Sequence, residues 1–234
     1  GTSVSIPADC EAEIAGPFMD ADAYRLPKND SMSVAGKLTD KKDSSSNAFS
    51  GMEVAGKLDV TEQGIVAVES GKLELVKTVS GQNQGSLSID QNASVEVKTG
   101  AALDVQNGTV TASGKVYTET GATFTASDEQ KENVTVVEDV KALTFTFHPN
   151  GGTFADGTTA DKTITTLAHP YTKAPTGLIK PGYTFSGWSG LSADGAYTAD
   201  TTFTAQWQSN GSGDSGSNSG GSSSSSYAVS VSSA

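Results

Sequence analysis

Two histidines, His148 and His169, are the first candidates for chemistry in this sequence, and a proline follows each of them. An imidazole pair can bind a metal ion or act in acid–base catalysis when further ligands or a carboxylate stand at a suitable spacing. The single cysteine, Cys10, is distant in sequence, and no carboxylate at ligand spacing accompanies the histidines. We interpret both as histidines in turns and predict no metal site, no cofactor and no catalytic residue.

Acidic residues are the second candidates, because enzymes that cleave polysaccharides use clustered carboxylates, often beside Arg or Lys. Asp20 and Asp22 form the only D-x-D pattern, and Arg25 is the only arginine. The remaining acids of interest stand singly among Ser and Thr, which predicts a solvated face: Asp59, Glu74, Glu96 and Asp104. The sequence therefore favours a protein that is not an enzyme. Cleavage of an acidic polysaccharide is a weaker alternative, since a polyanion would be repelled.

Aromatic residues in the second half could form a platform on which sugars stack. The candidates are Tyr171, Tyr183, Trp188, Tyr197 and Trp207. In so small a segment tryptophans usually form the core, so we predict that Trp188 and Trp207 are buried. Tyr171 and Tyr197 lie near expected turns, and we predict that they are exposed. The ligand-binding residues stay unknown at this point.

The charge is unevenly distributed along the chain. The net charge is -12, with 22 Asp and Glu against 11 Lys and Arg in residues 1–140, and 5 against 4 in residues 141–234. A negative chain is a poor partner for phosphate backbones, so nucleic acid is excluded as a partner. No stretch approaches the roughly 20 apolar residues of a membrane span.

The first half repeats itself. SMSVAGKLTD at 31–40 and GMEVAGKLDV at 51–60 match at six of ten positions, and GKLELV follows at 71–76. Apolar and polar residues alternate within each unit, which is the pattern of a strand with one buried face. Short strands at a short period predict a parallel β-helix over 31–140, which we expect to be right-handed. An antiparallel β-sandwich or stacked hairpins are the alternatives.

Residues 1–30 are either a cap of this solenoid or the remnant of an upstream domain.

The second half carries three ordered motifs. They are TFTFHPNGGTF at 144–154, KPGYTF with Gly187 and Trp188 at 180–188, and TFTAQW at 202–207. The segment 143–207 resembles the Listeria–Bacteroides repeat, an internalin B-repeat-like module. The resemblance implies a small β-grasp-like fold over 141–208 in a bacterial surface protein, acting as a spacer or contact module. His148 and Pro149 depart from the pair common at that place.

The expected architecture is thus all-β: a short parallel β-helix, a small β-grasp-like module, a disordered Ser/Gly linker at 209–226 and the start of a truncated next domain at 227–234. The single cysteine can close no disulfide within the chain, which suits either a cytosolic protein or an exported protein stabilised by β-structure, as in Gram-positive bacteria. We expect a non-catalytic stalk, spacer and adhesion region at the bacterial cell surface or cell wall, with a host glycan, mucin or surface protein as partner. The alternative is a set of spacer modules from a larger extracellular carbohydrate-active enzyme.

Overall fold

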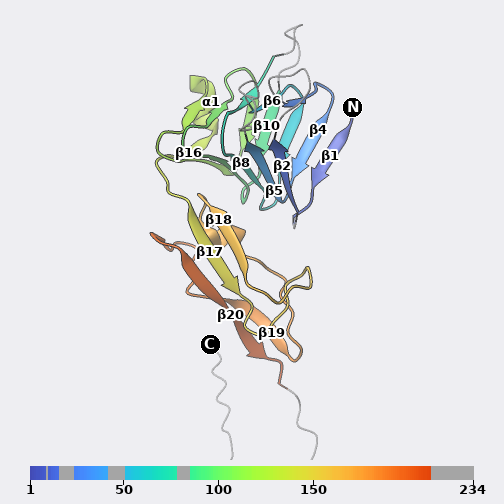
Figure 1. Cartoon of the computed structure of the whole chain (residues 1–234), viewed down its shortest axis with the longest axis vertical. Coiled ribbons are helices and arrows are strands. Elements are labelled where there is room, and N and C mark those ends of the chain that lie inside the picture. Colours follow the sequence, from blue (N-terminus) through green and yellow to red (C-terminus); the bar gives the residue numbers. More distant parts are fainter. Residues whose placement is uncertain (9, 16–23, 42–50, 78–84, 212–234) are drawn as a thin grey trace, which may run out of the picture.

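The computed structural model describes residues 1–8, 10–15, 24–41, 51–77 and 85–211. They form two successive units, a broad stack of short strands followed by a narrower, elongated four-stranded sheet (Figure 1). Most of the predicted linker and all of 227–234 lie outside the described residues. In the described part of the chain, no helix combines the length and the apolar character needed to cross a membrane.

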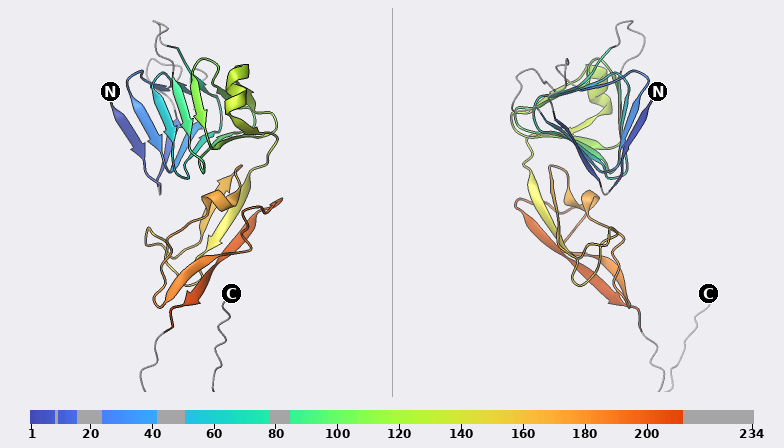
Figure 2. Two further views of the ribbon diagram at one scale, coloured as in Figure 1. Left: turned by 180° about the vertical axis from the view of Figure 1, so that it is seen from behind. Right: turned by 45° about the vertical axis from the view of Figure 1, so that its right-hand side comes forward.

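The first unit is a parallel β-helix with three sides, which confirms the predicted solenoid. Viewed nearly along its axis, the stack is triangular (Figure 2). Sheet A contains β1 (Ser3–Ile6), β4 (Ser31–Val34), β7 (Lys57–Val60), β10 (Ser86–Ile89) and β13 (Thr109–Ala112). Sheet B contains β2 (Glu11–Ala15), β5 (Lys37–Lys41), β8 (Ile65–Val68), β11 (Ser94–Val97), β14 (Lys115–Thr118) and β16 (Thr135–Val137). Sheet C contains β3 (Tyr24–Leu26), β6 (Gly51–Val54), β9 (Lys72–Leu75), β12 (Ala102–Asp104) and β15 (Thr123–Thr125).

The described residues of the segment 1–30 supply the first turn of the solenoid, because β1, β2 and β3 pair in parallel with β4, β5 and β6. The described residues of this segment therefore belong to the solenoid itself.

Like side chains stack on like along the solenoid. Met32 pairs with Leu58, which in turn pairs with Leu87, and all three are buried. The same inward positions form one continuous core of Val, Leu, Ile, Ala and Met along the stack. Each fully buried large side chain contributes roughly 1.5–3 kcal/mol, so strands of three to five residues that could not exist alone become stable together.

The repeated A-G-K stretch is a corner between two sides of the solenoid. The amides of Ala35 and Gly36 both donate to the carbonyl of Ile6 one turn earlier, at 2.9 and 3.2 Å. A side chain at Gly36 would lie 2.1 Å from the carbonyl oxygen of Cys10, so only glycine fits this close approach. Gly56 occupies an equivalent corner.

The 20-residue spacing of the two clearest repeats is not one turn of the solenoid. One turn advances the chain by between 20 residues, from Lys115 to Thr135, and 30 residues, from Lys72 to Ala102. The unit 31–40 joins sheet A to sheet B, whereas the unit 51–60 joins sheet C to sheet A. The same strand–corner–strand unit is therefore used at different corners of the triangle.

A short helix, α1 (Asp128–Asn133), packs beside β13 where the described solenoid ends. Ser127 and Gln130 form a reciprocal capping box at its start. The side-chain Nε2 of Gln130 also donates to the carbonyls of Val105 at 2.6 Å and Gly108 at 2.7 Å. The helix is thereby fixed to backbone groups of the last full turns.

The second unit is a mixed four-stranded sheet in the order β18-β17-β20-β19. Its strands are β17 (Leu143–His148), β18 (Lys162–Thr166), β19 (Tyr183–Ser189) and β20 (Thr201–Ser209), with a 3-10 helix, η1 (Pro170–Lys173). The central pair β17–β20 is parallel and the outer pairs are antiparallel. The β-grasp-like classification stays a prediction, while the all-β prediction is confirmed.

An aromatic core holds this sheet together. Phe147 lies 5.0 Å from Trp188 and 5.4 Å from Phe203, measured between ring centroids. A bulge in β19 between Phe185 and Gly187 adds one residue, so that Phe185 and Trp188 both reach the same core despite their odd spacing.

Candidate functional site

The two units meet on the outer side of sheet B. Outward positions of β8 and β11, which should face solvent in a free solenoid, are buried like the inward ones. Ala67 and Glu96 are each only 1% exposed. Side chains from β18 and η1 of the second unit bond to this region, so we take it as the docking face.

Lys173 is the principal contact across the junction. It ends η1, and its side chain enters a ring of backbone carbonyls on the solenoid. Its Nζ donates to the oxygens of Gln63 at 3.0 Å, Gly64 at 3.3 Å and Asn92 at 2.9 Å. An ammonium group has three donors, and here all three find an acceptor.

Burial has an electrostatic cost for this amine. Lys173 is 4% exposed, and burial lowers the pKa of its amine to about 8, while the Glu96 carboxylate opposes the lowering. The amine is still mostly protonated at neutral pH. A buried charge of this kind is tolerated because it is fully hydrogen-bonded and lies near an opposite charge.

Glu96 is the acidic partner at the junction, and it corrects the prediction of a solvated face. Its Oε1 accepts a hydrogen bond from the hydroxyl of Thr166 in β18, and Thr166 in turn accepts from the amide of Ala168 at 2.9 Å. Lys98 lies 3.9 Å from the other carboxylate oxygen. Burial, together with the charge of Glu96, raises the pKa of the nearby Tyr117 hydroxyl.

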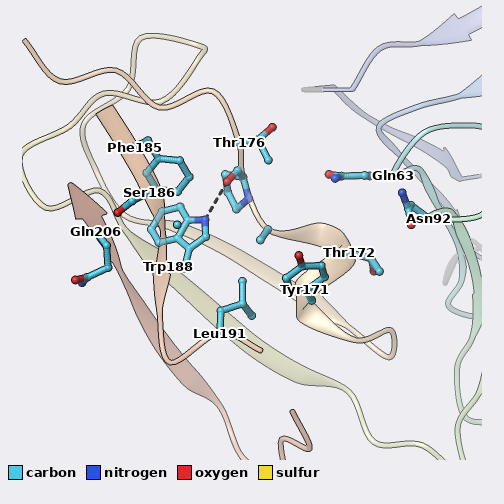
Figure 3. A pocket seen from close by; sticks show the side chains of 13 residues that line it. Gln63, Asn92, Tyr171, Thr172, Thr176, Phe185, Ser186, Trp188, Leu191 and Gln206 are labelled. Carbon is cyan, nitrogen blue, oxygen red and sulfur yellow. Dashed lines mark hydrogen bonds between the residues drawn. The ribbon is translucent and has the colours of Figure 1, made fainter. Parts of the chain in front are cut away.

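A pocket of about 500 Å³ opens beside this contact (Figure 3). Gln63 and Asn92 reach it from the solenoid, while Tyr171 and Trp188 come from the second unit. Other lining residues are Thr172, Ala174, Pro175, Thr176, Phe185, Ser186, Gly187, Leu191 and Gln206. The pocket therefore exists only where the two units are joined.

The pocket wall around Trp188 is firmly held. The indole Nε1 donates to the carbonyl of Pro175 at 2.9 Å, and the ring packs on Phe147, Phe154 and Phe185. Trp188 is 9% exposed, as predicted for a core residue. Trp207 is half-buried and packs on Phe185 at 5.6 Å between centroids, so it belongs to the edge of that core.

The tyrosines have different surroundings. Tyr171 is 52% exposed, as predicted, and lies at the pocket. The prediction that Tyr197 is exposed is wrong: it is half-buried, with its ring edge-on to Phe145 and Phe203, and its hydroxyl donates to Gly190 at 3.0 Å. Tyr183 is exposed and lies under the ammonium group of Lys180.

The two histidines are not brought together, and each has a separate partner. His148 Nδ1 lies 2.6 Å from a carboxylate oxygen of Asp161, an acid that the sequence did not pair with it. His169 Nδ1 accepts from the amide of Tyr171 while Nε2 donates to the carbonyl of Gly195 at 2.6 Å, which requires the neutral imidazole. Among the described residues, no three or more His, Cys, Asp and Glu side chains gather in a group that could hold a metal ion.

Two of the predicted surface acids form an ion pair within their own strand: Asp59 with Lys57 at 2.8 Å, and Glu74 with Lys72. Arg25 of β3 instead pairs with Glu53 of the neighbouring strand β6. Asp20 and Asp22 lie outside the described residues. Glu53, Glu74 and Asp104 lie at successive register positions of sheet C, where the ion pairs to Arg25 and Lys72 offset two of the three charges.

Asp40 is an unusual buried residue that the sequence motifs do not mark. It points into the solenoid from β5, is 0% exposed, and neither of its carboxylate oxygens has a hydrogen-bond partner in the described chain. Burial raises the pKa of its carboxyl to about 7, and the nearby backbone of Met52 opposes this only in part. Asp40 takes the place that Val60 has in the second repeat, so aligning the repeats could have revealed it.

Comparisons with protein-family models, with curated proteins and with solved structures found no match to this chain.

Proposed function

We propose that this chain is a non-catalytic part of a secreted bacterial cell-surface protein, in which the solenoid and the second unit form one stiff stalk that presents a binding surface. The observation that carries the proposal is the junction between the two units. There the ammonium group of Lys173 donates hydrogen bonds to the backbone carbonyls of Gln63, Gly64 and Asn92. A flexible tether between independent domains would need no such contact. Buried polar contacts with fixed geometry favour one relative orientation.

The surface location rests on the motifs in 143–207 and their resemblance to the Listeria–Bacteroides repeat. The Ser/Gly-rich composition of 209–226 is typical of linkers in multidomain proteins. On the described solenoid, Asp59 and Glu74 are engaged in ion pairs with lysines of their own strands, which supports a structural role over a catalytic one. A glycan, mucin or protein on a host surface is the proposed partner.

The stiffness of the junction can be tested by small-angle X-ray scattering together with residual dipolar couplings on the whole chain. We expect one alignment tensor to fit the amides of both units. Lys173→Met should give two independent tensors and a broader distribution of distances. Two tensors in the unmodified protein would contradict the stalk proposal, whatever the chain binds.

A further inference from the structure

We infer that the pocket at the junction is a binding site for a neutral saccharide, one or two sugar rings in size. This rests on the proposed display function and names the surface that does the binding. About 500 Å³ lies within the range of small-ligand pockets, roughly 300–1,000 Å³.

The polar groups of the pocket are available to a ligand. The side-chain amides of Gln63 and Asn92 form no hydrogen bond within the described chain, and the same holds for the hydroxyls of Tyr171, Thr176 and Ser186. An amide has both donors and an acceptor, and a hydroxyl is both donor and acceptor. These groups match the hydroxyls of a sugar, each of which also donates and accepts.

Apolar surface lies opposite these amides. Trp188 and Phe185 stand on the side away from the solenoid, with Tyr171 between them and the two amides (Figure 3). The C–H face of a pyranose ring is apolar, whereas its rim carries hydroxyls. The aromatic side chains on one wall can pack against the C–H face, and the amides on the opposite wall can bond to the hydroxyls of the rim.

Charge selects against ionic ligands. None of the residues that line the pocket carries a charge. The ammonium group of Lys173 lies next to the pocket but already donates to three carbonyls. A cation would find no carboxylate in the lining, and an anion would approach a chain of net charge -12. A neutral ligand is the class that remains.

The pocket is built before a ligand arrives. Lys173 bonds to the backbone carbonyls of Gln63 and Asn92, and the side chains of these same two residues line the pocket. Its neighbours Thr172 and Ala174 also line it. The contact that joins the two units therefore also fixes the distance between the opposite walls. Such preorganisation lowers the cost of ordering a site on binding.

The test is a ¹H–¹⁵N NMR titration of the whole chain with methyl glycosides of glucose, galactose, mannose, N-acetylglucosamine and N-acetylgalactosamine. Glucuronic acid, glucosamine and an uncharged Ser/Ala tetrapeptide serve as comparison probes. Each is added to about 10 mM, because a single small ligand of this kind is expected to bind in the millimolar range. We expect at least one neutral glycoside to shift amides near 63, 92 and 171–176 and the indole of Trp188, while the indole of Trp207 stays unchanged.

Variants locate the site without disturbing the junction. Gln63→Ala with Asn92→Ala removes both amides but keeps the backbone carbonyls that bind Lys173, and Tyr171→Ala removes an exposed ring. Each should weaken binding roughly tenfold or more. Tyr183→Ala is the matched control, since Tyr183 is similarly exposed but lies outside the pocket. It should bind like the unmodified chain.

Three results would overturn the inference: no neutral glycoside shifts the pocket resonances, the peptide or a charged sugar binds in preference, or the double alanine variant binds unchanged. A single alignment tensor with no glycoside binding would refute the saccharide site and leave the stalk proposal standing. Two tensors in the unmodified chain would refute the stalk independently of any titration.

Discussion

The Nζ atom of Lys173 lies 2.9 Å from the backbone oxygen of Asn92, a residue 81 positions earlier in the chain and in the other structural unit. No side-chain pair forms this bond; a lysine from one unit meets a turn of the other. Because the lysine is the only side chain in this bond, a single substitution at position 173 removes it.

Lys173→Met should loosen the junction. Methionine keeps the apolar stem but removes the donor from the carbonyl oxygens of Gln63 and Asn92, while Gly64 keeps its bond from the amide of Ser94. Glu96 also loses one of its two neighbouring cations, and only Lys98 remains. We expect the second unit to lose about 2–4 kcal/mol of stability. Urea unfolding followed by tryptophan fluorescence measures this, because both tryptophans lie in that unit. Lys115→Met, at an exposed position of sheet B, is the control, and an equal loss there would contradict the prediction.

Asp40→Val should stabilise the solenoid in a pH-dependent way. The carboxyl has a pKa of about 7 when folded and an ordinary value of 3.8 when unfolded, so the folded state binds more protons between these values. Stability of the unmodified chain therefore falls as the pH rises from about 4 to 7. The gain from the valine should be largest above pH 7, at most about 4 kcal/mol, and smallest below pH 4. Urea unfolding midpoints of the two proteins, measured at pH 4 and at pH 8, test this prediction. An equal gain in stability at the two pH values would contradict a raised pKa of Asp40 in the folded state.

Trp188→Ala should unfold the second unit rather than only impair binding. The ring packs on Phe147, Phe154 and Phe185, and its removal leaves a large cavity. Losses of about 3–5 kcal/mol are typical of such truncations in a core. Circular dichroism and calorimetry on heating provide the measurement, with Tyr183→Ala as the exposed aromatic control. An unchanged melting transition would show that Trp188 is not part of the core.

Gln130→Ala should fray the end of the solenoid next to α1. The change removes the amide bonds to Val105 and Gly108 and the acceptor for the amide of Ser127. We expect a loss of about 1–3 kcal/mol, confined to the last turns. Amide hydrogen exchange should accelerate in β13 and β15 but not in β4 or β7. Glu129→Ala, exposed on the same helix, should leave exchange unchanged, and faster exchange throughout the solenoid would contradict a local capping role.

The solenoid could be predicted from sequence because period-two alternation and recurrent glycine corners are local signals. Leu58 and Val60 point inward as their spacing predicts, and Gly56 stands where a side chain would strike a carbonyl. Which strands share a sheet could not be predicted in this way, because the 20-residue spacing of the repeat is not the length of one solenoid turn. Local patterns do not say which sheet a strand will join.

The junction could not be predicted in the same way. Glu96 has the alternation of a solvent-facing residue, and only the docking of β18 and η1 buries it. The acceptors for Lys173 are backbone carbonyls, which every residue possesses, so no residue type marks them. The pocket follows from the junction and was inaccessible for the same reason.

The parallel pairing of β17 with β20 has a mechanical consequence. The chain enters the second unit at Leu143 and leaves it after Ser209, at opposite ends of two adjacent strands that run in the same direction. Tension along the chain would pull these strands past each other lengthwise, so their backbone hydrogen bonds would bear the load together instead of opening one after another. The order of strands in this small sheet thus places its most force-resistant geometry directly in the line of pull.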